Sequence, residues 1–125
     1  MRWNAFWKIL KRNWRAAIYL FVLAPLAEEC LFRGVLFAPL ARRCLPAAYA
    51  LSMFLFAGMH VFQFLGSMTA ANTILCLSLY LPASFSLCWV YQKTGNIWAG
   101  IFLHMFINFQ SVLASLLRSL MQAFL

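Results

Sequence analysis

Charged residues are scarce in this sequence. Only 10% of its 125 residues are charged and two are acidic, whereas soluble domains carry about 25% charged residues. Hydrophobic residues make up 66% of the chain, against about 45–50% in soluble domains. This composition excludes an ordinary soluble globular domain. The length allows one domain, and at about 20 apolar residues per crossing it has room for about four membrane-spanning helices.

Acidic residues are too few to balance the basic ones, and the formal net charge is +8. Nucleic-acid binding needs such charge on a water-exposed surface, which this hydrophobicity argues against, so we expect no nucleic-acid partner. Lys and Arg near the ends of membrane helices instead set topology and contact anionic lipids. Arg118 and the basic residues before the first apolar run outnumber Arg42, Arg43 and Lys93 on the opposite side. This bias predicts a cytoplasmic N-terminus, with membrane lipids as partners.

The sequence has no C-x-x-C pair. Its four cysteines lie inside or beside apolar runs, at Cys30, Cys44, Cys76 and Cys88. This placement indicates small core residues and favours neither a disulfide framework nor a cysteine zinc site.

Two regions can be distinguished along the chain. In residues 1–15, aromatic residues recur at three- and four-residue steps among basic ones, which predicts an N-terminal amphipathic helix lying at the membrane interface. Residues 16–125 then form an all-α transmembrane domain, with apolar runs at about 16–40, 46–64, 68–91 and 97–120. We expect an integral membrane bundle of about four helices.

Two local features shape these runs. Pro82 lies inside the third run, which predicts a kinked helix or two shorter pieces; because this run has no ionisable group, we expect it to be scaffold. Residues 92–96 predict a turn, and Asn96 is a good N-cap for the last helix.

Every acidic residue and every histidine lies inside an apolar run: Glu28 and Glu29 in the first, His60 in the second and His104 in the last. Ionisable groups within a membrane span are costly unless they pair or face an aqueous cavity, so they indicate a functional site. Asn108 follows His104 by four residues and shares its helix face.

The spacing of these residues suggests how they pair. Glu29 and Arg33 are four residues apart and can form an ion pair along one helix face. Glu28 points about 100° away from Glu29 and is free for another partner. A carboxylate beside a histidine suits general-base activation of water. The alternative is a buried salt bridge with hydrogen bonds that only join helices; we favour the functional interpretation because costly polar groups without a role are easily replaced.

Three ordered motifs resemble the CPBP family of CAAX proteases and bacteriocin-processing enzymes, also called the Abi family. They are Glu28-Glu29-x-x-x-Arg33, Phe56-x-x-x-His60 and His104-x-x-x-Asn108. The resemblance implies an intramembrane endopeptidase in which Glu28 and His60 activate water while His104 and Asn108 stabilise the oxyanion. It also implies that Glu29, Arg33 and Phe56 support the site. The substrate would be a peptide or protein with a membrane-accessible or prenylated C-terminus.

Several alternatives remain open at this point. In an older interpretation of the same motifs, Glu28, His60 and His104 bind a catalytic zinc; we prefer the mechanism without a metal or other cofactor, because Asn108 is a poor zinc ligand and a natural oxyanion donor. A non-catalytic immunity or partner-binding membrane protein is a second alternative, and a small proton carrier a third. We expect a bacterial cell membrane as the location, and a homodimer could enclose the site of so small a protein.

Overall fold

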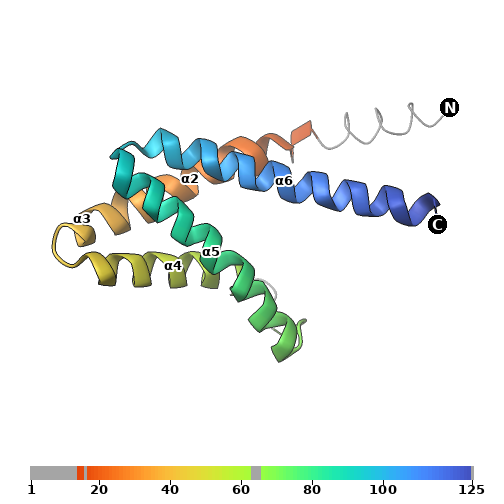
Figure 1. The fold of residues 1–125 in the computed structure, drawn as a ribbon, viewed down its shortest axis with the longest axis horizontal. Coiled ribbons are helices and arrows are strands. Elements are labelled where there is room, and N and C mark those ends of the chain that lie inside the picture. The colour runs from red at the N-terminus through yellow and green to blue at the C-terminus, as the bar shows by residue number, and fades with distance from the viewer. Residues whose placement is uncertain (1–13, 16, 63–65, 125) are drawn as a thin grey trace.

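The structure, a computed structural model, describes residues 14–15, 17–62 and 66–124. Within these ranges all regular elements are helices, which confirms the all-α prediction (Figure 1). In chain order they are η1 (Tyr19–Leu23), α2 (Ala24–Glu29), η2 (Cys30–Phe37), α3 (Ala38–Ala41), α4 (Leu45–Phe62), α5 (Ala70–Thr94) and α6 (Ile97–Phe124). The amphipathic helix predicted for residues 1–15 lies outside the described residues except for its last two.

The first helical run, from η1 to α3, alternates between π-helical and α-helical segments. Pro25 lies in the first turn of α2, directly after η1, and Pro39 in the first turn of α3, directly after η2. A proline lacks an N–H donor and crowds the carbonyl four residues earlier, which gives a physical reason for the wider turns before each of them. The run corresponds to the first predicted span and carries both glutamates.

Three helices, α4, α5 and α6, are long and apolar enough to cross a membrane. Their outer faces carry exposed apolar side chains such as Phe54, Leu79 and Phe102, as expected where lipid covers the surface. Together with the η1–α3 run they form an integral membrane bundle. In α5 the helix continues through Pro82 and extends to Thr94, so the expectations of two shorter pieces and of a turn beginning at residue 92 are wrong.

Local capping explains the connection between the last two helices. Gly95 ends α5 in the left-handed conformation, with φ 62°, and its N–H donates to the carbonyl of Tyr91. Asn96 Oδ1 accepts a 2.9 Å hydrogen bond from the Trp98 N–H, which confirms it as the N-cap of α6. The connection is therefore a tight reversal that places α6 back alongside α5.

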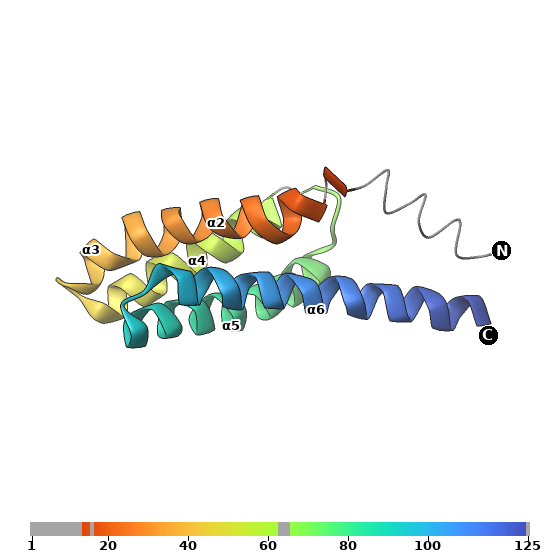
Figure 2. The same ribbon diagram turned by 90° about the horizontal axis from the view of Figure 1, so that it is seen from above.

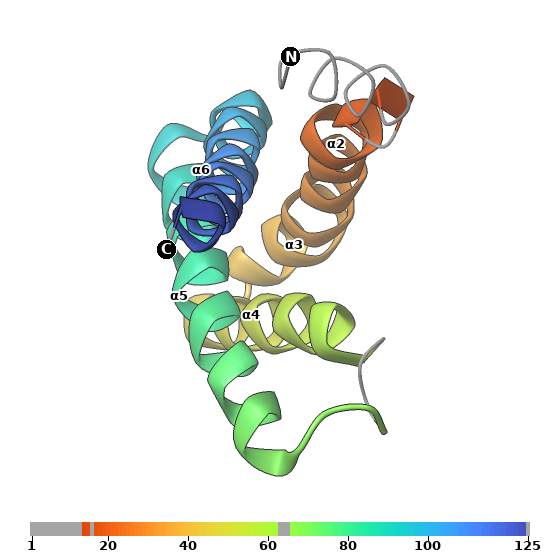
Figure 3. The same ribbon diagram turned by 90° about the vertical axis from the view of Figure 1, so that its right-hand side faces the viewer.

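The helical runs pack against one another. Viewed along the bundle, α2 and α6 stand side by side while α4 and α5 lie beneath them (Figure 3). The N-terminal part of α5 diverges from the other helices (Figure 1). The start of the first run and the end of α6 point to the same end of the molecule, and α6 extends beyond the other helices (Figure 2).

Two small clusters form the apolar core. One contains Phe32, Phe56 and Leu87, and the other contains Phe37, Ala48 and Cys88.

Of the four cysteines only Cys88 is fully buried, whereas Cys30 and Cys44 are exposed, so the prediction of core cysteines is wrong for those two. Cys30 lies on an outward face of η2 and Cys44 lies in the link between α3 and α4, and hydrophobicity alone reveals neither position.

Candidate active site

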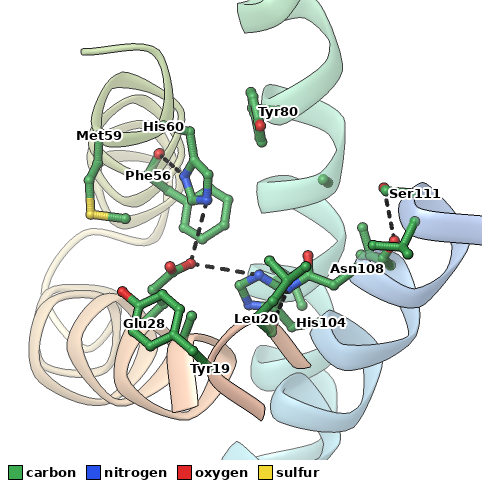
Figure 4. A pocket seen from close by; sticks show the side chains of 15 residues that line it. Tyr19, Leu20, Glu28, Phe56, Met59, His60, Tyr80, His104, Asn108 and Ser111 are labelled. Carbon is green, nitrogen blue, oxygen red and sulfur yellow. Dashed lines mark hydrogen bonds and ion pairs between the residues drawn. The ribbon is translucent and has the colours of Figure 1, made fainter. Parts of the chain in front are cut away.

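Glu28, His60 and His104 converge from three helices (Figure 4). The Oε2 atom of Glu28 lies 3.6 Å from Nε2 of His60 and 3.6 Å from Nε2 of His104. That oxygen is buried and has no direct hydrogen-bond partner among the described residues. Both distances slightly exceed a direct hydrogen bond, so the three atoms surround a position that a small polar group can share.

The ring of His60 is oriented by its own helix. Its Nδ1 lies 2.9 Å from the carbonyl oxygen of Phe56, one turn earlier on α4. A carbonyl only accepts hydrogen bonds, so Nδ1 carries the proton and donates it. In the neutral imidazole the lone pair is therefore on Nε2, the nitrogen that faces Glu28.

The ring of His104 is oriented by Glu29. His104 Nδ1 donates to Glu29 Oε1 over 2.9 Å, and Arg33 Nη1 donates to the same oxygen over 3.1 Å. All three side chains are buried, with at most 5% of any of them exposed. The predicted Glu29–Arg33 pair is therefore present, and it has an additional partner that the helix spacing could not indicate.

Phe56 is at the centre of these groups. Its ring centroid lies 4.7 Å from the guanidinium carbon of Arg33, 4.5 Å from the His60 ring and 5.5 Å from the His104 ring. The contact with Arg33 is a cation–π interaction in a desolvated position. Phe56 therefore fills the space between the ion pair and both imidazoles.

A cavity of about 570 Å³ opens beside these atoms. Glu28, His60, His104 and Asn108 line it together with residues of all four helical runs, among them Tyr19, Leu20, Met59, Tyr80, Ile107 and Ser111. Asn108 Nδ2 donates a 2.9 Å hydrogen bond to the carbonyl of Leu20. An amide has two N–H donors, so this bond ties α6 to the first helical run and uses one of them.

Helix α5 contributes to the site, contrary to the scaffold role expected for it. The Tyr80 ring stacks on His60 with centroids 4.6 Å apart. The hydroxyl and carbonyl of Ser84 accept hydrogen bonds from Arg33 over 3.0 and 3.1 Å. Neither residue is an acidic residue or a histidine, so a search for buried acids and histidines missed them. Their four-residue spacing was the available signal.

A zinc ion would need three ligand atoms at about 2.0–2.2 Å around one point. Among residues 14–15, 17–62 and 66–124, no group of three His, Cys, Asp or Glu side chains is arranged to hold a metal ion. Two tetrahedral ligands at such bond lengths are about 3.3–3.6 Å apart, and Glu28 Oε2 lies 3.6 Å from Nε2 of both His60 and His104. Zinc on these three residues therefore stays an alternative prediction.

Comparisons with known proteins identify the family of this chain. Residues 11–110 match the family described as type II CAAX prenyl endopeptidase Rce1-like. One relative, named "Putative membrane peptidase YdiL" and found in Bacillus subtilis (strain 168), is 30% identical over 87 residues, which are 70% of this chain and 32% of the relative. The chain thus spans about a third of that relative's length. No solved structure matches. With all three motifs inside the matched range, the chain belongs to the type II CAAX prenyl endopeptidase Rce1-like family.

Proposed function

We propose that this protein is an intramembrane endopeptidase that hydrolyses a peptide bond with water activated by Glu28 and His60. One observation carries the proposal: a carboxylate oxygen and two imidazole nitrogens from three helices meet beside a cavity within a membrane bundle. Family membership supports the same reaction. Burying so many polar groups in a membrane protein is costly, which makes them a candidate functional site.

Water fits between Glu28 and His60 as a double donor. A water oxygen about 2.8 Å from both Glu28 Oε2 and His60 Nε2 lies to one side of the line that joins them. It donates one hydrogen to the carboxylate and the other to the imidazole lone pair. Its own lone pairs then face the cavity, where a substrate carbonyl would lie.

The proposed reaction follows from these roles. The water oxygen attacks the carbonyl carbon while Glu28 takes its proton, and the carbonyl oxygen becomes an oxyanion. His104 Nε2 and the second N–H of Asn108 donate to that oxyanion. When the C–N bond breaks, Glu28 returns the proton to the amine, and the second hydrogen of the water stays on the new carboxyl group, so the products are a carboxylic acid and a free amine.

Oxyanion stabilisation constrains the charge on His104. Because Nδ1 already donates to Glu29, His104 can donate from Nε2 as well only as an imidazolium. The Glu29 carboxylate places an opposite charge beside that cation, and the hydrogen bond from Arg33 holds the carboxylate in place. The network behind His104 therefore has a direct role in the proposed mechanism.

The substrate class and location follow as further proposals. The cavity lining runs from Glu28 towards Tyr19, at the end of the bundle where the described chain begins. With a cytoplasmic N-terminus, a substrate would enter from the cytoplasmic side of a bacterial cell membrane. Its scissile bond would lie near a membrane-accessible or prenylated C-terminus, and a second copy of the chain could complete the enclosure.

The test is cleavage of fluorogenic peptides, one of them prenylated, by detergent-purified wild type and Glu28→Gln, with and without a strong chelator. We expect Glu28→Gln to lower kcat by about 10²–10⁴-fold and the chelator to have no effect. Ser78→Ala is the control, because this exposed hydroxyl bonds only to its own helix in the described contacts.

Activity lost on chelation and restored by zinc would favour the metalloprotease alternative. Cleavage unaffected by Glu28→Gln would remove Glu28 as the base. No cleavage by wild type would favour an immunity or partner-binding role.

A further inference from the structure

The imidazole of His60 is stacked between aromatic rings from two helices. Phe56 of α4 lies 4.5 Å away by ring centroid at an interplanar angle of 37°. Tyr80 of α5 lies 4.6 Å away at 31°. In Figure 4 the His60 ring is between the two, with its Nε2 turned towards Glu28. These are offset-stacked distances, which contribute beyond simple apolar burial.

The orientation of this ring decides whether His60 can accept a hydrogen from the attacking water. Rotation about the bond to the imidazole is broad and weakly restricted in histidine. Both the Nδ1 hydrogen bond and one stacking contact come from Phe56, on the same helix turn. A contact from a second helix is what relates the ring plane to the rest of the site.

We propose that Tyr80 is a positioning residue, whose ring holds His60 with Nε2 directed at the Glu28 carboxylate. This inference rests on the proposed function, since it assigns Tyr80 a part in water activation. The ring carries the effect, because stacking involves the face of the ring and no hydrogen bond from the hydroxyl is needed.

The same face of α5 supports both halves of the site. Tyr80 and Ser84 are four residues apart and therefore neighbours on one helix face. Tyr80 contacts His60, on the water-activating side. Ser84 accepts two hydrogen bonds from Arg33, behind His104. A single helix thus fixes His60 directly and His104 through Arg33 and Glu29.

Kinetics of Tyr80→Phe and Tyr80→Leu test the inference. We expect Tyr80→Phe to keep the kcat of wild type, and Tyr80→Leu to lower kcat by about 10- to 100-fold with little change in KM. Tyr91→Leu is the matched control: it makes the same change on the same helix, in a tyrosine whose ring contacts Phe37 edge-to-face at the other core cluster. It should keep the kcat of wild type.

NMR chemical shifts of His60 test the contact between the Tyr80 and His60 rings independently of peptide cleavage. The chain has two histidines, so selective labelling gives ring signals from His60 and His104 alone. Tyr80→Leu should move the His60 ring protons downfield as the ring-current shift is lost, and should change the His60 nitrogen shifts. Tyr80→Phe and Tyr91→Leu should leave them in place, and all variants should leave the His104 signals near their wild-type positions.

Different results overturn the two proposals. If Tyr80→Leu keeps wild-type kcat, or if Tyr80→Phe loses as much activity as Tyr80→Leu, positioning by the ring is wrong. Unchanged His60 signals in Tyr80→Leu also overturn it, even in a protein that cleaves no peptide. Absence of cleavage by wild type, together with the expected change in the His60 signals, counts against the proposed function while keeping the orienting role of Tyr80.

Discussion

Glu29 is the residue on which the site's electrostatics depend. One of its oxygens accepts hydrogen bonds from both Arg33 and His104, and the whole side chain is buried. A buried ion pair gains little over an apolar pair, but removal of one partner leaves an uncompensated charge. The pair therefore matters chiefly for orienting His104.

This asymmetry predicts how variants of the pair behave. Glu29→Gln leaves the Arg33 guanidinium buried without a counter-charge, which should cost about 3–5 kcal/mol of stability. A double variant, Glu29→Leu with Arg33→Met, removes both charges and should be clearly more stable than Glu29→Gln. Thermal unfolding in detergent measures both, with wild type as the reference.

Activity separates the two roles of the pair. Both variants should lose peptide cleavage, because His104 Nδ1 no longer has a carboxylate partner. A double variant no more stable than Glu29→Gln would contradict the account of the buried charge. A double variant with wild-type activity would contradict the role given to Glu29 in orienting His104.

At the scale of the elements, the approach of α6 to α2 depends on a glycine. A Cβ atom added at Gly100 would lie 3.1 Å from Glu29 Oε2, tighter than ordinary van der Waals contact. The obstacle is a carboxylate already held by two partners, so it has little freedom to shift. Gly100 therefore allows the helix carrying His104 to pack directly on Glu29.

A matched pair of glycine substitutions tests this packing. Gly58, inside α4, has nothing within 4 Å of an added Cβ, so Gly58→Ala should raise stability by up to about 1 kcal/mol through helix propensity. Gly100→Ala gains the same propensity but displaces Glu29, so it should bring no net stabilisation and should lower kcat. Unfolding midpoints and peptide cleavage provide both readouts. A Gly100→Ala variant as stable and as active as Gly58→Ala would refute the argument.

At the scale of the whole molecule, the helical runs alternate in direction, so the start of η1 and the end of α6 lie at the same end (Figure 1). Helix α6, with 28 residues, is about 42 Å long at 1.5 Å per residue. That exceeds the hydrocarbon thickness of about 30 Å, so α6 must tilt or project from the bilayer. The link between α3 and α4, which includes exposed Cys44, lies at the opposite end.

Thiol labelling tests this topology together with the predicted cytoplasmic N-terminus. Cys44 should react with a membrane-impermeant maleimide added outside intact cells, in a background where the other three cysteines are alanine. A cysteine introduced by Gln122→Cys, with all native cysteines replaced, should react only after the membrane is opened. The reverse pattern would mean the opposite orientation. Labelling of both sites in intact cells would contradict the placement of Cys44 and the end of α6 at opposite ends of the bundle.

The sequence by itself determined the features that depend on local spacing. The apolar runs predicted the helices, Glu29 and Arg33 were paired by a four-residue separation, and Asn96 was identified as an N-cap, because each depends on residues within one or two turns. The three motifs also identified the family. Scarce charge made the site residues conspicuous, since each acid and histidine within a span needs a reason to be there.

Only the tertiary structure decided how the helices face one another. The rotation of α5 about its axis brings Tyr80 to His60 and Ser84 to Arg33. The four-residue spacing puts these two side chains on one helix face, but it does not indicate which neighbouring helices that face meets. Likewise the bond between His104 and Glu29 joins residues 75 positions apart. Such contacts depend on packing across helices, where a side chain's partner is set by the surfaces that meet and not by its neighbours in the chain.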